Sequence, residues 1–247
     1  MKLKRYFIVW IGVSLMLLTV LLTLFTTMAD DGMEWDYQFL FEQVVKHFVT
    51  MIFPMCITLI SGYMISREYT DDTLKNIETL PISFRKLLAG KLIVSAILSL
   101  FLGIVCFAFT VVANFIMGYD GFALIPALTG LVQMALLGLF LYLTMLPIIV
   151  LTSRHKGSFL VGVIVAFVYG FIGMFANGTL QSIYPVSAAL GLINYRAGAE
   201  GVMWNKGLCF ISILIMCAIG IALMFVKQKP EKREAKKTQH TAPKKGW

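Results

Sequence analysis

The sequence has few charged residues for its length. Of its 247 residues only 14% are Asp, Glu, Lys or Arg, whereas 59% are hydrophobic. Soluble domains carry about 25% charged residues. Several stretches here continue for roughly 18 residues or more without a charge, which is enough to cross a hydrocarbon core of about 30 Å. The composition therefore excludes a soluble globular domain and predicts an integral membrane protein.

The sequence also lacks the motifs of several catalytic and metal-binding classes. It contains no G-x-x-x-x-G-K-[ST], no G-x-S-x-G and no H-E-x-x-H motif. Its three histidines lie in separate connections, and its four cysteines lie inside apolar runs without C-x-x-C spacing. These absences argue against ATP binding by a P-loop in this chain, against an embedded enzyme and against a metal site. We expect no cofactor.

Six apolar runs are long enough to cross a membrane, and we expect helices because isolated strands cannot satisfy their backbone groups in lipid. The predicted spans are Phe7–Phe25, Phe48–Ile65, Leu92–Met117, Phe122–Leu151, Phe159–Ala176 and Gly207–Val226. No acidic or basic residue lies deep in these runs, which argues against a proton- or sodium-coupled carrier. The predicted fold is all-α: one six-helix membrane domain over residues 1–226, followed by a basic cytoplasmic tail over residues 227–247.

The basic residues are distributed unevenly between the two sides of this topology. Only Lys46, Arg196 and Lys206, of 21 Lys and Arg residues, fall on the side opposite the termini. Because positive residues favour the cytoplasmic side, we expect both termini in the cytoplasm. The net charge of +8 therefore does not indicate a nucleic-acid partner. The stretch over residues 179–195 is too short and too polar for a seventh span, and we expect an outer segment within residues 177–206.

A charged stretch interrupts the apolar chain between the second and third predicted spans, "REYTDDTLKNIETLPISFRKLLAGK", residues 67–91. Leu74, Ile77 and Leu80 recur every three residues and give one apolar edge to a two-turn helix, Thr73–Leu80, that Pro81 ends. Such a helix could lie on membrane lipid or could dock into a groove of a cytoplasmic partner. The pattern alone favours neither alternative.

The same stretch resembles the cytoplasmic loop of permease subunits in type-2 ATP-binding cassette exporters, above all those of lantibiotic-immunity and bacitracin-resistance systems. The resemblance lies in "RE" after the second span, "TLK…LP-S", and "RK-L-GK" before the third. It implies a multi-pass permease of the bacterial plasma membrane, without catalytic activity, that pairs with a second permease chain, identical or related. A separate cytoplasmic ATP-binding subunit would contact the coupling helix. The coupling residues that it implies are Glu68, Thr73, Leu74, Ile77, Leu80, Pro81, Arg85, Lys86 and Lys91.

Two further groups of residues are candidates for substrate contact. The first outer loop, which starts near Met28 and ends at Phe48, combines acidic and aromatic residues that could hold a cationic amphipathic peptide. Outer loops are also simply poor in Lys and Arg, and aromatic residues favour membrane interfaces. Polar residues inside the spans could contact substrate or form hydrogen bonds between helices. The candidates from both groups are Asp30, Asp31, Glu34, Trp35, Asp36, Asn114 and Gln133.

The leading hypothesis is therefore the membrane subunit of an exporter that expels an antimicrobial peptide, lantibiotic or bacitracin-like, or a similar amphiphile, and so gives self-immunity or resistance. One alternative is a membrane sensor or scaffold that transports nothing. Another is a permease for a different substrate, such as a drug or a lipid.

Overall fold

The computed structural model describes residues 4–27, 35–70, 84–152, 158–196 and 203–225. Every regular element within these ranges is a helix, as the all-α prediction requires. The elements are α1 (Lys4–Thr27), α2 (Tyr37–His47), η1 (Phe48–Ile52), α3 (Phe53–Thr70), α5 (Phe84–Met117), α6 (Leu124–Thr152), α7 (Phe159–Ile172), η2 (Gly173–Phe175), α8 (Thr179–Ile183), α9 (Pro185–Leu192) and α10 (Lys206–Phe225).

Five helices among the described residues are long and apolar enough to cross a membrane. They are Phe7–Thr27, Tyr37–Arg67, Lys86–Met117, Leu124–Thr152 and Lys206–Phe225. The fifth predicted span forms a shorter apolar helix, Phe159–Phe175. Pro147 lies inside α6 without interrupting it. Within the described residues the protein is therefore an all-helical polytopic membrane protein, and each predicted span overlaps a helix.

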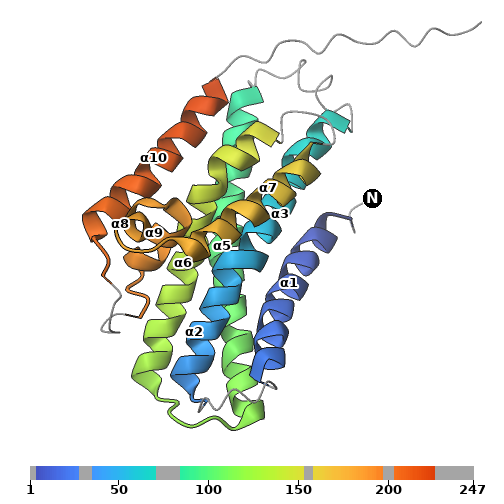
Figure 1. The fold of residues 1–247 in the computed structure, drawn as a ribbon. Coiled ribbons are helices and arrows are strands. Elements are labelled where there is room, and N and C mark those ends of the chain that lie inside the picture. Colours follow the sequence, from blue (N-terminus) through green and yellow to red (C-terminus); the bar gives the residue numbers. More distant parts are fainter. Residues whose placement is uncertain (1–3, 28–34, 71–83, 153–157, 197–202, 226–247) are drawn as a thin grey trace, which may run out of the picture.

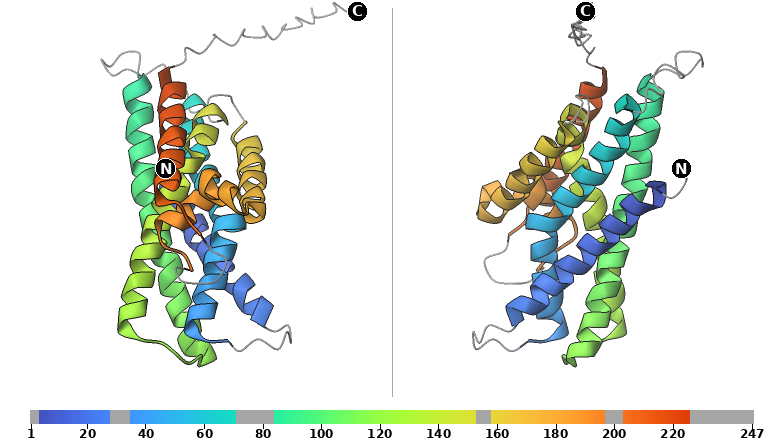
Figure 2. Two further views of the ribbon diagram at one scale, coloured as in Figure 1. Left: turned by 60° about the vertical axis from the view of Figure 1, so that its left-hand side comes forward. Right: turned by 90° about the vertical axis from the view of Figure 1, so that its right-hand side faces the viewer.

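The helices form an elongated bundle (Figures 1 and 2). α1, α2, α5 and α6 reach its lower end, whereas α7 and α10 occupy only its upper part. The first turn of α1 lies nearer the upper end than its last turn does, and the last turn of α10 lies at the upper end. That this end faces the cytoplasm stays a prediction from the charge distribution.

The second spanning helix is longer than predicted, and this corrects the boundary between loop and helix. α2 begins at Tyr37 instead of Phe48, and η1 and α3 continue it without a break. Its start is capped by Asp36, whose carboxylate accepts a hydrogen bond of 2.7 Å from the Phe39 amide. Residues of one face are buried at helical spacing: Tyr37, Leu40, Phe41, Val44, Val45 and Phe48. Packing of that face makes this part of the predicted outer loop helical.

A π-helical turn joins α2 to α3, and its cause is Pro54. Proline has no backbone N–H, so the Thr50 carbonyl lacks its ordinary partner four residues later. The backbone widens over Phe48–Ile52, where the Phe53 amide donates to the Phe48 carbonyl. α7 approaches this turn closely: a methyl group on Gly170 would lie 2.9 Å from the Thr50 carbonyl oxygen.

The segment between α7 and α10 forms two short helices, α8 and α9, neither of which is long enough to span a membrane. They lie at mid-height in the bundle, beside the first turns of α10 (Figure 1). α9 also packs against α6. The sequence-based exclusion of a seventh span is consistent with this arrangement.

Candidate functional site

The predicted coupling helix lies outside the described residues: Thr73, Leu74, Ile77, Leu80 and Pro81. The helices that flank it are described. Glu68 belongs to the last turn of α3, and Arg85 to the first turn of α5. Both turns lie at the upper end of the bundle (Figure 1).

Two more of the predicted coupling residues lie near the start of α5. The Lys91 ammonium donates a hydrogen bond to the Met64 carbonyl on α3. Lys86 is exposed. The two helices that enter and leave the charged stretch are thus tied to each other one to two turns from their ends.

Of the predicted acidic outer residues, only Asp36 is described, and it has a structural partner. Its carboxylate caps α2, while Asp30, Asp31 and Glu34 lie outside the described residues. Trp35 packs edge-on against Phe39, with ring centroids 4.7 Å apart, and stacks on Tyr119 at 6.2 Å. Trp35 therefore anchors the start of α2 against the loop that follows α5.

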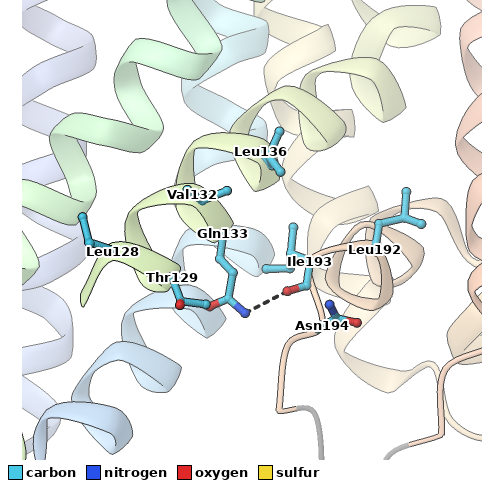
Figure 3. Close-up of a pocket in the computed structure, with 8 residues that line it drawn as sticks. All are labelled: Leu128, Thr129, Val132, Gln133, Leu136, Leu192, Ile193 and Asn194. Carbon is cyan, nitrogen blue, oxygen red and sulfur yellow. Dashed lines mark hydrogen bonds between the residues drawn. The ribbon is translucent and has the colours of Figure 1, made fainter. Parts of the chain in front are cut away.

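The two intramembrane candidates do not come together in one site. Asn114, on α5, is 2% exposed, and its side-chain oxygen has no hydrogen-bond partner among the described residues. Gln133, on α6, donates a hydrogen bond of 2.8 Å to the Ile193 carbonyl at the end of α9 (Figure 3). Around it lies an open groove of about 460 Å³ whose other walls include Leu128, Val132 and Leu136.

The turn that ends α9, residues 193–196, contacts two different helices. The Ile193 carbonyl accepts the bond from Gln133. The Tyr195 hydroxyl donates to the Glu42 carbonyl at 3.1 Å, and the Arg196 guanidinium pairs with the Glu42 carboxylate at 3.2 Å. Burial raises the pKa of the Tyr195 phenol, and the Glu42 carboxylate acts in the same direction, while Arg196 acts in the opposite one. Tyr195 therefore stays a hydrogen-bond donor at neutral pH.

The backbone of this turn is unusual. Asn194 and Arg196 have φ angles of 56° and 51°, in the left-handed region that costs a residue with a Cβ roughly 1–2 kcal/mol. Asparagine tolerates this region better than arginine does. The bonds from Tyr195 and Arg196 to Glu42 hold the strained turn in place.

A pocket of about 410 Å³ lies between α2 and the segment from η2 to the 193–196 turn. Apolar residues from η1, η2, α9 and Trp204 form much of its wall. Its charged and amide side chains are Glu42, Gln43, Lys46, Asn177, Gln181 and Arg196. The arrangement can bind a molecule that combines an apolar body with a charged group.

Sequence reasoning missed this pocket because it assigned Glu42 and Lys46 to a loop. The candidate span Tyr37–Arg67 contains both residues within its first ten positions. They lie outside the predicted span Phe48–Ile65, which itself has no charged residue. The apolar residues of 37–48 recur at helical spacing, and this pattern, together with Asp36 as an N-cap signal, could have identified the helix from the sequence. The pairing with Arg196 has no local signal.

Comparison with known proteins assigns the chain to a family. The sequence model of the family described as ABC-2 family transporter protein matches residues 1–173, from α1 into η2. The chain belongs to this ABC-2 transporter family. The resemblance seen in the charged stretch is thereby confirmed, and the protein is an ABC transporter permease of the bacterial cell membrane.

A curated relative of this ABC-2 permease is the bacitracin transport permease protein BCRB of Bacillus licheniformis. The two are 25% identical over 169 residues, which cover 68% of this chain and 79% of the relative. No solved structure matches. The family match ends at residue 173, so one wall of the pocket, on α8, α9 and the 193–196 turn, lies beyond it.

Proposed function

We propose that this ABC-2 permease is the membrane subunit of an exporter that expels an antimicrobial peptide, bacitracin-like or lantibiotic-like, or a similar amphiphile, and thereby gives resistance. The observation that carries the proposal is the similarity to a bacitracin transport permease. ATP hydrolysis takes place in a separate subunit, since this chain has no P-loop motif and its family is that of transporter membrane proteins. Two permease chains pair in the assembled exporter.

In this proposal, movement of the ATP-binding subunit reaches the bundle through the charged stretch between α3 and α5. The bond between Lys91 and the Met64 carbonyl supports this, because displacement of either helix end is passed to the other. Glu68 lies at the α3 end of the stretch, and Arg85 and Lys86 at the α5 end. The helix Thr73–Leu80 is the proposed contact with the ATP-binding subunit.

The first experiment searches the genes beside that of the permease for a Walker-motif ATPase without membrane spans. It then co-expresses the two proteins and measures co-purification and bacitracin resistance. Leu74→Asp with Ile77→Asp places charge on the apolar edge, and we expect both association and resistance to be lost. Lys75→Asp with Thr79→Asp places two aspartates on the opposite edge of the helix, and we expect association to be retained. Intact association of the first double variant would refute the docking role. Loss of resistance without loss of association would indicate a role other than docking.

A second experiment tests the acidic outer residues for attraction of a cationic peptide. Asp30→Asn, Asp31→Asn and Glu34→Gln are combined while Asp36 is kept, because its carboxylate caps α2. We expect severalfold weaker resistance to cationic peptides, with a smaller difference at high salt. Unchanged resistance at normal expression would exclude this role.

A further inference from the structure

The pocket between α2 and the 193–196 turn has a charge arrangement that a purely structural contact does not need. Three charged side chains line it, Glu42, Lys46 and Arg196. Glu42 is only 16% exposed and pairs with Arg196, which is 49% exposed. These two residues neutralise each other across the pocket wall.

Lys46 is the third charge and is left over from this pair. It is exposed and forms no ion pair with any described residue. The described wall of the pocket therefore carries an excess of one positive charge. A cationic ligand would meet one carboxylate that is already shared, whereas an anionic group would meet a lysine and the outer side of a guanidinium.

The position of the pocket selects an amphiphile over a free anion. Tyr37–Arg67 has 31 residues, or about 46 Å of helix at 1.5 Å per residue, against a hydrocarbon core of about 30 Å. The excess of about 16 Å equals the length of α2, which has 11 residues. Lys46, in the last turn of α2, therefore lies near the level at which headgroups meet hydrocarbon. The remaining wall offers Val49, Met174, Leu190 and Trp204, which suit an alkyl chain or an apolar side chain.

We infer that this pocket binds the anionic group of an amphiphile, a phosphate or carboxylate on an apolar body, with Lys46 as its direct contact. The Glu42–Arg196 pair positions the 193–196 turn as the far wall. Only one part of the inference rests on the proposed function, namely that the bound amphiphile is the exported substrate. Binding itself is a property of the permease alone and is tested without the ATP-binding subunit.

The test measures acylation of lysine amines in the full-length permease, held in phosphatidylcholine nanodiscs, by mass spectrometry. Dodecyl phosphate is the probe, and Lys206 is the internal control because it is exposed and does not line the pocket. We expect dodecyl phosphate to slow acylation of Lys46 at least fivefold and to leave Lys206 unchanged. Dodecanol, dodecyltrimethylammonium and inorganic phosphate should not protect Lys46.

Affinity is then measured as the rise in the unfolding midpoint with dodecyl phosphate concentration. Lys46→Gln should weaken binding about tenfold and Lys46→Arg should restore it, while Lys206→Gln should have no effect. Equal affinity of wild type and Lys46→Gln would overturn the assignment of Lys46. Protection by dodecanol equal to that by dodecyl phosphate would overturn the anionic preference.

Phosphatidylglycerol nanodiscs distinguish a bilayer lipid from a free amphiphile as the source of the anion. Protection of Lys46 in these discs without probe would support the binding chemistry and identify a bilayer lipid. Reactive Lys46 in phosphatidylglycerol, protected only by dodecyl phosphate, would support the same chemistry and identify a free amphiphile. None of these binding experiments measures resistance or ATPase association. A negative binding result therefore does not contradict the proposed exporter function, and a negative result for export does not contradict binding at Lys46.

Discussion

The α5–α6 interface and the contact of the 193–196 turn with α2 hold the bundle together in different ways. α5 and α6 approach each other through glycines. A methyl group on Gly138 would lie 2.5 Å from the Ser99 carbonyl oxygen, and a methyl group on Gly103 would lie 2.5 Å from the Met134 carbonyl oxygen. The 193–196 turn meets α2 through one ion pair and one hydrogen bond.

This difference separates a fixed contact from one that can be exchanged. Backbones in van der Waals contact have no alternative arrangement without a cavity or a clash. An ion pair whose arginine is half exposed is worth little against water, so a ligand or a second conformation can replace it at small cost. We therefore expect α5 and α6 to move as one unit and the 193–196 turn to move relative to α2.

The largest effect should come from filling the α5–α6 crossing. Gly138→Ala places a methyl group against backbone that cannot rotate away, and we expect destabilisation by about 1–3 kcal/mol, measured by thermal unfolding of the purified protein. Gly90→Ala is the control, because nothing lies within 4 Å of that position, and should be neutral or slightly stabilising. A neutral Gly138→Ala would mean that α5 and α6 can separate, and their interface would then not be a fixed contact.

A smaller effect should follow when the ion pair is removed. Glu42→Gln leaves Arg196 without its partner, but Arg196 is half exposed, so we expect a loss of only about 1 kcal/mol. The unfolding midpoint measures it, and a double-mutant cycle with Arg196→Gln isolates the pairwise part.

The control for this cycle is Gln38→Ala, an exposed position on the same helix, which should be neutral. A coupling energy of several kcal/mol would contradict the exchangeable character of the contact. A coupling energy near zero would remove Glu42 as the residue that holds the turn.

The spanning helices could be predicted because lipid imposes a simple rule on composition. A helix that faces lipid must be apolar over roughly 20 residues, so the apolar runs identified the five helices long enough to span a membrane and the shorter helix Phe159–Phe175. The start of α2 was missed for a related reason. Its exposed face carries Gln38, Gln43 and Lys46, and this polar side resembled a loop until the buried face was seen to recur at helical spacing.

The candidate pocket could not be predicted from sequence, since its walls come from distant segments. Tyr195 and Glu42 are 153 positions apart, and no local pattern specifies their contact. The same holds for Gln133, which lies inside the candidate span Leu124–Thr152 and whose partner, the Ile193 carbonyl, is a backbone atom. Hydropathy determines which segments enter the membrane; side-chain packing decides which of them meet.

The other polar contact of the 193–196 turn should have a smaller effect still. Gln133→Leu removes the bond to the Ile193 carbonyl, and we expect a loss of about 0.6 kcal/mol in the unfolding free energy. Val132→Leu, in the same groove, keeps that bond and is the control. If Gln133→Leu cost as much as Gly138→Ala, the turn would be held as firmly as the helix crossing.

At Asn114, substitution is expected to cause no loss of stability, in contrast to the substitutions above. Its side chain is 2% exposed, and its oxygen has no partner among the described residues, so burial costs free energy that leucine of similar size would not. Asn114→Leu should leave the free energy of unfolding unchanged or raise it by up to about 1 kcal/mol. The unfolding midpoint measures this change. If Asn114 contacts substrate, resistance falls in this variant while stability does not. A clear loss of stability would instead show that Asn114 forms a packing contact as firm as the α5–α6 crossing.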